Sequence, residues 1–508
     1  MSLVDDFIGA ISPAAAVRRQ RARLQLDALR RYDGASRGRR TDGWLTQGTS
    51  ADAAASLGRK TLRDRSRDLV RNNPYAAKAV QVIVSNTIGT GIVAQAKAQR
   101  SRRRSQQFTD VWRGWATDPL QCDFNGRLDF YGIQALVLRC VVESGEALIR
   151  RRTPTDGQRI PLQLQVLEPD LLDTSHDGVD EDGSYTREGI KHDANGRRLG
   201  YWLYADHPGE QHARITSFVS SFVPADEVIH VFRQDRPGQT RGVPWASPII
   251  IRLRDFDDYS DAQLLKQKIS ACFTAFAVDT EAPDAGMGTE LIDKLEPGAI
   301  EILPPGKDIR FASPPTVGDF DKISRQYLLQ IAAGFGITYE ALTGDLNNTS
   351  FSSGRMGWLE FQRNIESWRW QMLVPQLLDP VWRWFTAAGS VNGVRMDGIV
   401  PQWTPPRREL IDPATEIKAT GLAVRYGFQT LSEAIRELGY DPEEVMQEMA
   451  DDNALIDKLG LVLDSDPRKV SAAGLTQVRP VGSEYPGTGQ PPEENAPPAN
   501  SSQAQQSE

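Results

Sequence analysis

The pattern of hydrophobic and polar positions first divides the chain into helical and strand-rich parts. Residues 57–88 carry apolar side chains at helical spacing, and Asn72-Asn73-Pro74 interrupts them with a stop-and-restart signal. We therefore expect two helices joined at Pro74. Short apolar or alternating runs separated by turn residues fill the chain between Leu128 and Val223, which predicts a strand-rich section. Within it, the turn Asp193-Ala194-Asn195-Gly196 predicts a hairpin, because Asn and Gly tolerate positive φ.

Two further helices are predicted on either side of a Pro- and Gly-rich insert. No Gly or Pro occurs from 249 to 278, which predicts one long helix with a packed face and a solvated face. The insert, 279–315, contains strand-like runs at 299–303 and 309–311. We expect the second helix at residues 320–335.

A polar segment and an aromatic helix follow. The small, polar and nearly uncharged side chains around 342–354 cannot bury enough surface to fold alone, so we expect a loop. Beyond it, apolar side chains recur at spacings of 3 and 4, at Trp358, Phe361, Ile365, Trp368 and Met372. This stripe predicts an amphipathic helix with a core-facing side, kinked further on by Pro375 and Pro380.

The C-terminal end is acidic. Asp412-Pro413 and Asp441-Pro442 predict the starts of short helices over 412–460, with Asp as cap and Pro in the first turn. From Glu409 onward there are 18 acidic and 7 basic residues, whereas the whole chain has a net charge of −8. Gly, Pro, Ser, Gln and Glu dominate after Val470, which predicts a disordered tail.

Composition narrows the class of protein. A chain of 508 residues with 40% hydrophobic and 25% charged residues is typical of a folded, soluble protein. No apolar stretch approaches the ~18 residues that cross a bilayer, and Asp5 and Asp6 argue against an export signal. Three scattered cysteines suit neither a disulfide framework nor a zinc site, so we expect synthesis in a reducing compartment.

No motif predicts catalysis or a cofactor. Gly89-Thr90-Gly91 loosely matches a dinucleotide-binding fingerprint, but the run before it has helical spacing, and a tight turn is favoured. At Gly306-Lys307, Asp308 stands where a P-loop needs Ser or Thr. Residues 177–183 lack the bidentate Glu of a calcium loop, and the five histidines show no zinc-protease spacing. We predict no catalytic residue, no cofactor and no metal, and therefore no enzyme.

Basic clusters leave two interpretations open. Arginines gather at 18–23, 30–40 and 100–104. They can meet phosphate or form solvated faces, and we favour the solvated face.

Four runs in a fixed order carry a family resemblance. They are Arg65-Ser66-Arg67-Asp68-Leu69-Val70-Arg71-Asn72-Asn73-Pro74-Tyr75-Ala76, Asn86-Thr87-Ile88-Gly89-Thr90-Gly91-Ile92, Gly242-Val243-Pro244-Trp245-Ala246-Ser247-Pro248 and Thr349-Ser350-Phe351-Ser352-Ser353-Gly354-Arg355. Through them, the chain from about Tyr32 to Leu463 resembles the phage portal proteins of the lambda family.

The resemblance implies a structural protein of the virion, made in the host cytoplasm. Portals of this family form a ring, usually of twelve subunits, at one capsid vertex. Double-stranded DNA is packaged through the axial channel without sequence specificity, retained, and later ejected. The implied partners are the terminase large subunit, the major capsid protein and a head-tail adaptor, with no membrane.

The implied fold is an α+β portal fold. Its expected parts are an N-terminal arm (1–40), a wing (41–247), a first stem helix (248–278), a clip (279–315), a second stem helix (316–336), a tunnel loop (337–357), a long wing helix and return (358–408), a helical crown (409–465) and a disordered tail (466–508).

The resemblance also assigns two sets of site residues. In the tunnel loop we expect DNA-facing side chains at Asn347, Asn348, Thr349, Ser350, Ser352, Ser353 and Arg355. On the clip we expect a docking surface at Glu281, Asp284, Glu290, Lys307 and Asp308. An almost uncharged loop suits moving DNA, because fixed cationic contacts would act as a brake.

Two other functions stay open at this point. The Gly89 run and the basic clusters would also suit a nucleotide-dependent nucleic-acid-processing enzyme. A head-to-tail adaptor without a channel is the other alternative. A ring with an axial hole distinguishes the portal from the enzyme, and long stem helices distinguish it from a small adaptor.

Overall fold

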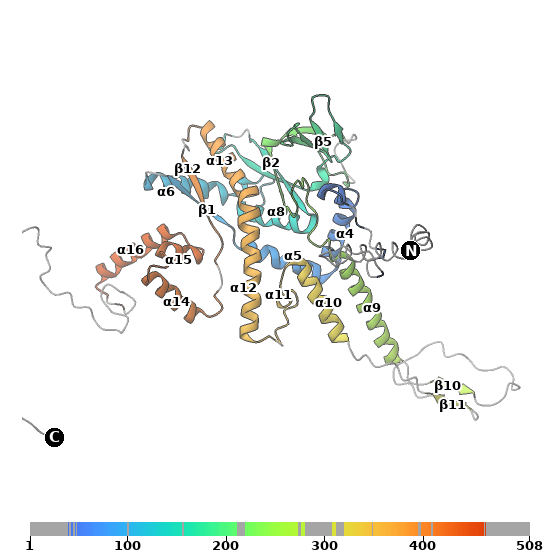
Figure 1. Cartoon of the computed structure of the whole chain (residues 1–508). Coiled ribbons are helices and arrows are strands. Elements are labelled where there is room, and N and C mark those ends of the chain that lie inside the picture. The colour runs from blue at the N-terminus through green and yellow to red at the C-terminus, as the bar shows by residue number, and fades with distance from the viewer. Residues whose placement is uncertain are drawn as a thin grey trace, which may run out of the picture. The chain divides into compact units, whose positions relative to one another are not determined.

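The computed structural model describes residues 39, 42–43, 46 and 48–463, apart from 99–100, 155–156, 211–218, 273–275, 280–306, 311–319, 348, 395–397, 408–409 and 462. The chain divides into two compact units between Pro406 and Arg407. The larger unit combines helices with small sheets, and every pairing between its named strands is antiparallel (Figure 1). The predicted mixture of helices and strands is therefore confirmed.

The first helices follow the predicted stop and restart. After the short α3 (Ala51–Ala55), α4 (Arg59–Asn72) and α5 (Pro74–Thr87) meet at Asn73. The Asn73 side chain accepts hydrogen bonds from the amides of Tyr75 and Ala76, both at 2.9 Å. Its amide nitrogen also donates to Asp257 at 2.7 Å, so one side chain caps α5 and contacts a distant helix.

The section that begins at Leu128 is not all strand, contrary to the sequence prediction. Residues Phe130–Ser144 form α8, which follows α6 (Arg102–Ala116) and α7 (Pro119–Cys122). Asp129 caps α8 by accepting from the Gly132 amide at 2.7 Å. The helix is apolar on most sides because it lies in the core, and this blurred the helical period in the sequence.

Two sheets make up the strand-rich part. The three-stranded sheet has the order β3-β2-β9, and the five-stranded sheet has the order β4-β5-β6-β7-β8. Their strands are β2 (Glu146–Arg152), β3 (Gln163–Leu167), β4 (Gly178–Val179), β5 (Tyr185–Arg187), β6 (Ile190–His192), β7 (Arg198–Leu203), β8 (Ser221–Pro224) and β9 (Val228–Phe232), with short 3₁₀ turns at Pro169–Leu171 and Ala225–Glu227. The predicted hairpin is confirmed as β6 and β7, whereas the fully buried β9 was missed.

The long helix expected at 248–278 is shorter than predicted. Helix α9 covers Ile250–Cys272, and Phe276–Asp279 forms strand β10 instead, paired with β11 (Lys307–Arg310). The absence of Gly and Pro suggested a helix to 278, but Phe276, Ala277 and Val278 pair across the β10–β11 ladder. Helix α10 (Phe320–Phe335) then packs beside α9.

The remaining elements of the larger unit are mainly helical. They are α11 (Tyr339–Thr343), α12 (Phe351–Ser367), a π-helical segment labelled η4 (Trp368–Leu378), α13 (Asp379–Val391) and β12 (Ile399–Thr404), which pairs with β1 (Val93–Ala98). Pro375 lies inside the π-helical segment. The chain therefore accommodates this proline through a change of helical winding.

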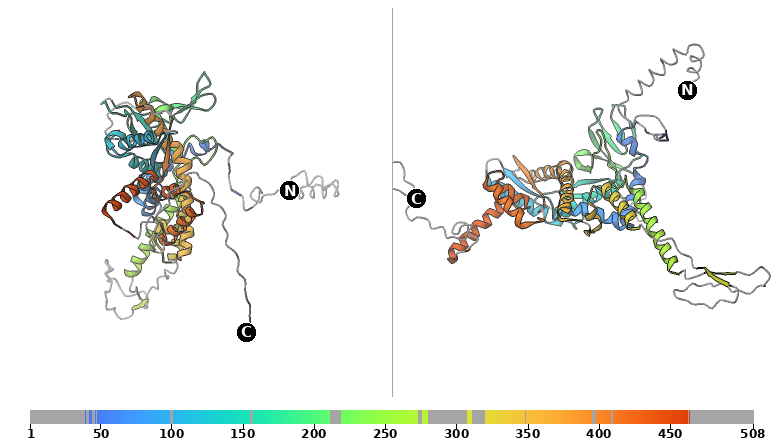
Figure 2. Two further views of the ribbon diagram at one scale, coloured as in Figure 1. Left: turned by 90° about the vertical axis from the view of Figure 1, so that its left-hand side faces the viewer. Right: turned by 60° about the horizontal axis from the view of Figure 1, so that its bottom comes forward.

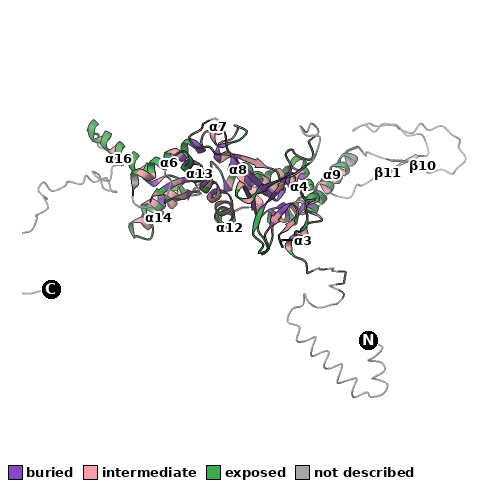
Figure 3. Ribbon diagram, turned by 90° about the horizontal axis from the view of Figure 1, so that it is seen from above, coloured by how far each residue is buried: buried purple, intermediate pink, exposed green. Residues whose placement is uncertain are grey.

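The predicted aromatic stripe does face the core. Phe361, Ile365 and Met372 are buried, and Trp358 and Trp368 pack against the same core. The centre of this core is Trp112, whose ring lies 4.8 Å from Phe385, 4.9 Å from Trp382 and 5.3 Å from Phe130. Figure 3 shows buried residues gathered around α4 and α8, whereas α16 is largely exposed.

The smaller unit contains three helices, α14 (Pro413–Arg425), α15 (Leu431–Glu437) and α16 (Pro442–Leu459), seen in orange and red in Figure 2. Asp412 and Asp441 cap α14 and α16 as predicted. Only Ala434 and Pro442 are buried among this unit's described residues. Phe428 is 86% exposed and Tyr426 is 72% exposed, so these helices make little core of their own.

A buried charge network joins the helices of the larger unit to its sheets. Glu146, at the start of β2, is fully buried and accepts two hydrogen bonds from Arg241 Nε, both at 2.9 Å. Arg63 of α4 lies 3.3 Å from the same carboxylate, and the His230 ring of β9 lies 3.0 Å from it. Arg59, one turn before Arg63, pairs with Glu188 and with Asp52.

This network keeps Glu146 ionised. Burial alone would raise the pKa of Glu146, but the Arg241 guanidinium and the His230 hydrogen bond hold it well below its ordinary value of 4.5. Burial also lowers the pKa of His230, so the imidazole stays neutral to lower pH than a free histidine. In both cases the unfolded chain binds more protons than the native protein as pH falls. This stability is therefore fully present above pH 6.5. Part of it is lost as pH falls from 6.5 to the lowered pKa of His230, and a further part as pH falls from 4.5 to the lowered pKa of Glu146.

We expect Glu146→Gln to destabilise the protein by about 3–5 kcal/mol at pH 7, because it removes the buried carboxylate that pairs with both Arg241 and Arg63. Arg241 would keep Glu188 at 3.7 Å, and Arg63 would keep Asp170 at 3.2 Å. Glu143→Gln is the matched control: Glu143 pairs with the half-exposed Arg139 at 3.6 Å, and its loss should cost less than about 1 kcal/mol. Urea unfolding of the full-length chain between pH 7 and pH 4 measures both values. Equal unfolding free energies for the two variants would contradict the role assigned to Glu146.

A second prediction concerns the close approach of α10 to the start of α9. A Cβ atom on Gly334 would lie 2.2 Å from Ile249 Cγ2, whereas one on Gly114 of helix α6 would meet nothing within 4 Å. We expect Gly334→Ala to destabilise by about 1–3 kcal/mol through overpacking. Gly114→Ala should stabilise by up to about 1 kcal/mol, because alanine favours helix. Thermal unfolding of both variants tests this, and a stabilised Gly334→Ala variant would rule out the tight helix contact.

Candidate functional site

The segment predicted as a polar loop is partly helical. Residues Tyr339–Thr343 form α11, and α12 begins at Phe351, not at Trp358 as predicted. The reason is local: Ser350 Oγ accepts a hydrogen bond from the Ser353 amide at 3.2 Å and so caps α12. A connection of residues 344–350 remains, within the range described apart from residue 348.

The predicted DNA-facing residues are therefore divided between two kinds of structure. Asn347, Thr349 and Ser350 lie in the connection, whereas Ser352, Ser353 and Arg355 lie in the first turns of α12. Asn348 lies outside the described residues. The assignment of these side chains to a DNA channel stays a prediction.

Hydrogen bonds hold the connection to the helices on either side. The Asp345 carboxylate accepts from the Tyr339 hydroxyl at 3.2 Å and from the Asn347 amide at 3.1 Å. The Asn347 amide, more than any other partner, lowers the pKa of Asp345. Arg325 of α10 lies 3.9 Å from the same carboxylate and 4.6 Å above the Tyr339 ring. The one charged residue of 344–350 is thus paired with a cation.

Sequence reasoning missed an apolar tip on this segment. Leu346, Phe351 and Met356 are 65%, 62% and 69% exposed. The three residues were visible in the sequence, but the surrounding Ser, Asn and Thr drew attention to polarity alone. The exposed tip therefore combines small polar groups with three large apolar side chains.

Helices α9 and α10 project from the core as an aromatic-linked pair. The Tyr259 ring lies 5.8 Å from Phe320 and 6.4 Å from Tyr327, and Phe256 lies 5.8 Å from Tyr327. Only Ile250, Leu253 and Phe256 are buried among the α9 residues whose burial is described. Leu264 and Leu265 are 50% and 58% exposed, so α9 presents apolar side chains to its surroundings.

Two of the predicted docking residues lie within the described part of the chain. Lys307 and Asp308 belong to β11 and pair with Asp279 and Val278 of β10. Glu281, Asp284 and Glu290 lie outside the described residues. Their role as a docking surface is untested and stays a prediction.

Other candidate sites have structural explanations. The Gly89–Gly91 turn follows helix α5, not a strand, so it lacks the setting of a dinucleotide fingerprint. Glu168, Asp170 and His207 have ligand atoms within 4.8 Å of one another and could in principle hold a metal. Arg67 already bonds Glu168 and Asp170, at 3.2 and 2.7 Å, so the cluster is an ion-pair site. Over the described range, no helix has the length and apolarity to cross a bilayer.

Comparisons with known proteins agree on one family. A sequence model described as "Phage portal protein, lambda family" matches residues 37–369. A probable portal protein of Halomonas phage phiHAP-1 is 27% identical over 494 residues, which cover 91% of this chain and 93% of the relative. Portal protein B of Escherichia phage lambda is 23% identical over 455 residues, which cover 79% of this chain and 85% of the relative.

A chain in a solved structure also matches, at lower similarity. A chain in the neck of a native gene transfer agent particle, computed with C12 symmetry, matches with a TM-score of 0.45 and 15% identity, over 74% of this chain and 94% of that chain. The family match itself covers more than half of the sequence, and both relatives extend over most of it. The chain belongs to the lambda family of phage portal proteins, the structural proteins of the virion at its head-tail connection.

Proposed function

We propose that this portal protein assembles into a closed ring at one capsid vertex, of twelve copies as the family resemblance implies, and that double-stranded DNA passes through its axial channel during packaging and ejection. The observation that carries the proposal is the set of exposed apolar side chains on α9, where Ile251, Leu264 and Leu265 are 71%, 50% and 58% exposed. Identical subunits that meet through such faces in a head-to-tail manner, with a rotation that closes, form rings.

The proposed ring uses each segment of the chain differently. Helices α9 and α10 are the stem, and the chain between them is the clip that docks the terminase large subunit and then the head-tail adaptor. Lys307 and Asp308 would belong to that docking surface, with Glu281, Asp284 and Glu290. The remainder of the larger unit is the wing that contacts the major capsid protein, and α14–α16 form the crown.

Electrostatics support the connection 344–350 as the DNA-facing tunnel loop. Each fixed cation near DNA displaces counterions and adds affinity, with a salt slope of about −0.9 per phosphate neutralised. The connection contains no cation, and its Asp345 is paired with Arg325. Asn347, Asn348, Thr349 and Ser350 can contact phosphates through neutral hydrogen bonds, which form and break easily as DNA moves.

We expect Asn347→Lys to slow DNA packaging, most strongly at low salt, because a ring of added cations would hold the phosphate backbone. Asn195→Lys is the matched control: Asn195 lies exposed in the β6–β7 turn, away from the proposed channel, and adds the same charge. Single-molecule packaging velocity at low and high salt measures the effect. Equal velocities for Asn347→Lys and Asn195→Lys at low salt would overturn the lumen assignment.

A further inference from the structure

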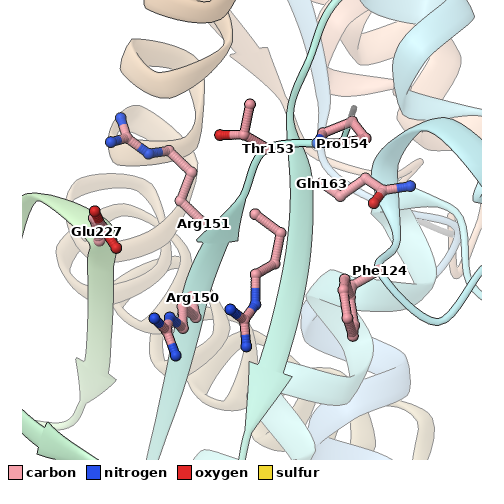
Figure 4. Close-up of a pocket in the computed structure, with 8 residues that line it drawn as sticks. Phe124, Arg150, Arg151, Thr153, Pro154, Gln163 and Glu227 are labelled. Carbon is pink, nitrogen blue, oxygen red and sulfur yellow. The ribbon is translucent and has the colours of Figure 1, made fainter. Parts of the chain in front are cut away.

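An arginine-rich pocket lies at the C-terminal end of β2, the central strand of the sheet β3-β2-β9. It has a volume of about 380 Å³, and the three consecutive arginines Arg150, Arg151 and Arg152 line it together with Glu227, Phe124 and Thr153. Figure 4 shows Arg150, Arg151 and Glu227 on one side of the pocket and Phe124 on the other. The ring-forming role proposed above makes no use of this pocket.

The described residues that line the pocket carry more positive charge than negative charge. Three arginines and one acidic residue, Glu227, are among the described residues of the lining, so their formal charges sum to +2. Arg150 Nε is shielded from solvent, and no hydrogen-bond acceptor in the described part of the chain pairs with it. Burial and then the adjacent charge of Arg150 lower the pKa of Arg152. A solvated basic face would not shield a donor in this way, because an unpaired buried donor is costly.

Neighbouring side chains hold the arginines in place. The Arg152 guanidinium lies 5.3 Å above the Phe124 ring, and its Nε donates to Gln165 Oε1 at 2.8 Å. Arg151 lies 5.9 Å from the Trp384 ring. Two of the three guanidinium groups are therefore oriented before any ligand arrives, which reduces the entropy lost on binding.

We propose that this pocket binds a phosphate group. A phosphate dianion matches the +2 charge of the lining, and its oxygens accept the forked N–H groups that guanidinium presents. A single carboxylate would leave one positive charge unpaired. The phosphate has two possible sources, the DNA backbone and free phosphate in solution, and the two share this chemistry.

Isothermal titration calorimetry of the full-length protein with inorganic phosphate at low ionic strength tests the proposal. We expect saturable binding that Arg150→Gln weakens about tenfold or more, because a charged hydrogen-bond donor is lost. Glu227→Gln should tighten binding by about two- to fivefold, because it removes the one acidic side chain among the described residues that line the pocket. Arg197→Gln, an equal loss of charge at an exposed turn, should leave binding unchanged.

The opposite signs expected for Arg150→Gln and Glu227→Gln separate phosphate binding from a loss of folding, since misfolding cannot tighten binding. Titration with a short DNA duplex then identifies the source. Displacement of bound phosphate by the duplex assigns the pocket to the DNA backbone, and its absence assigns the pocket to free phosphate. Equal phosphate binding by the native chain, Arg150→Gln and Glu227→Gln would overturn the proposal.

Discussion

The position of helix α9 depends on one buried carboxylate. Glu146 binds Arg241, and it also accepts a hydrogen bond from the Gly242 amide at 2.9 Å. The two backbones pass so closely there that a Cβ on Gly242 would lie 2.1 Å from the Gly145 carbonyl oxygen. Three residues later the Trp245 amide donates to the Val142 carbonyl at 3.1 Å, and α9 begins at Ile250. The charge network of α4, β2 and β9 thus fixes where the projecting helix leaves the core.

The protein combines a well-packed core with segments that leave large apolar side chains exposed. Aromatic packing around Trp112 and the charge network around Glu146 stabilise the core. Helix α9, the tip at Leu346, Phe351 and Met356, and the helices of the smaller unit instead leave large apolar side chains exposed. Exposed apolar surface of this kind indicates contacts with other chains. A structural protein of the virion needs this division, because it must be stable and must also bind other chains.

Local signals in the sequence predicted local structure well. Asp412 and Asp441 cap helices as expected, two helices meet at Asn72–Pro74 as expected, and the turn at Asp193–Gly196 forms the expected hairpin. Helix α8 was missed because its sequence is apolar almost throughout, so no clear polar face reveals its period. The start of α12 was predicted too late in the chain. Ser350 was counted among the small polar residues of a loop, whereas its side chain caps the helix.

Long-range contacts could not be predicted from the sequence. The Glu146 network joins Glu146 to Arg241, 95 positions away, and Arg59 to Glu188, 129 positions away. The pairing of β1 with β12 joins residues that are even further apart. The Arg150–Arg152 run is visible in the sequence, but only the fold brings Glu227 and Phe124 to the same pocket. Such sites need the tertiary structure, because spacing along the chain gives no information about them.

The most direct test of the central claim is a cryo-electron microscopy reconstruction of the full-length protein in DNA-filled particles. We expect a closed ring with an axial hole, in which α9 and α10 surround the DNA. We also expect the connection 344–350 to be the part of the chain nearest to the duplex axis. A reconstruction without a closed ring, or one in which residues 344–350 lie on the outer surface away from DNA, would contradict it.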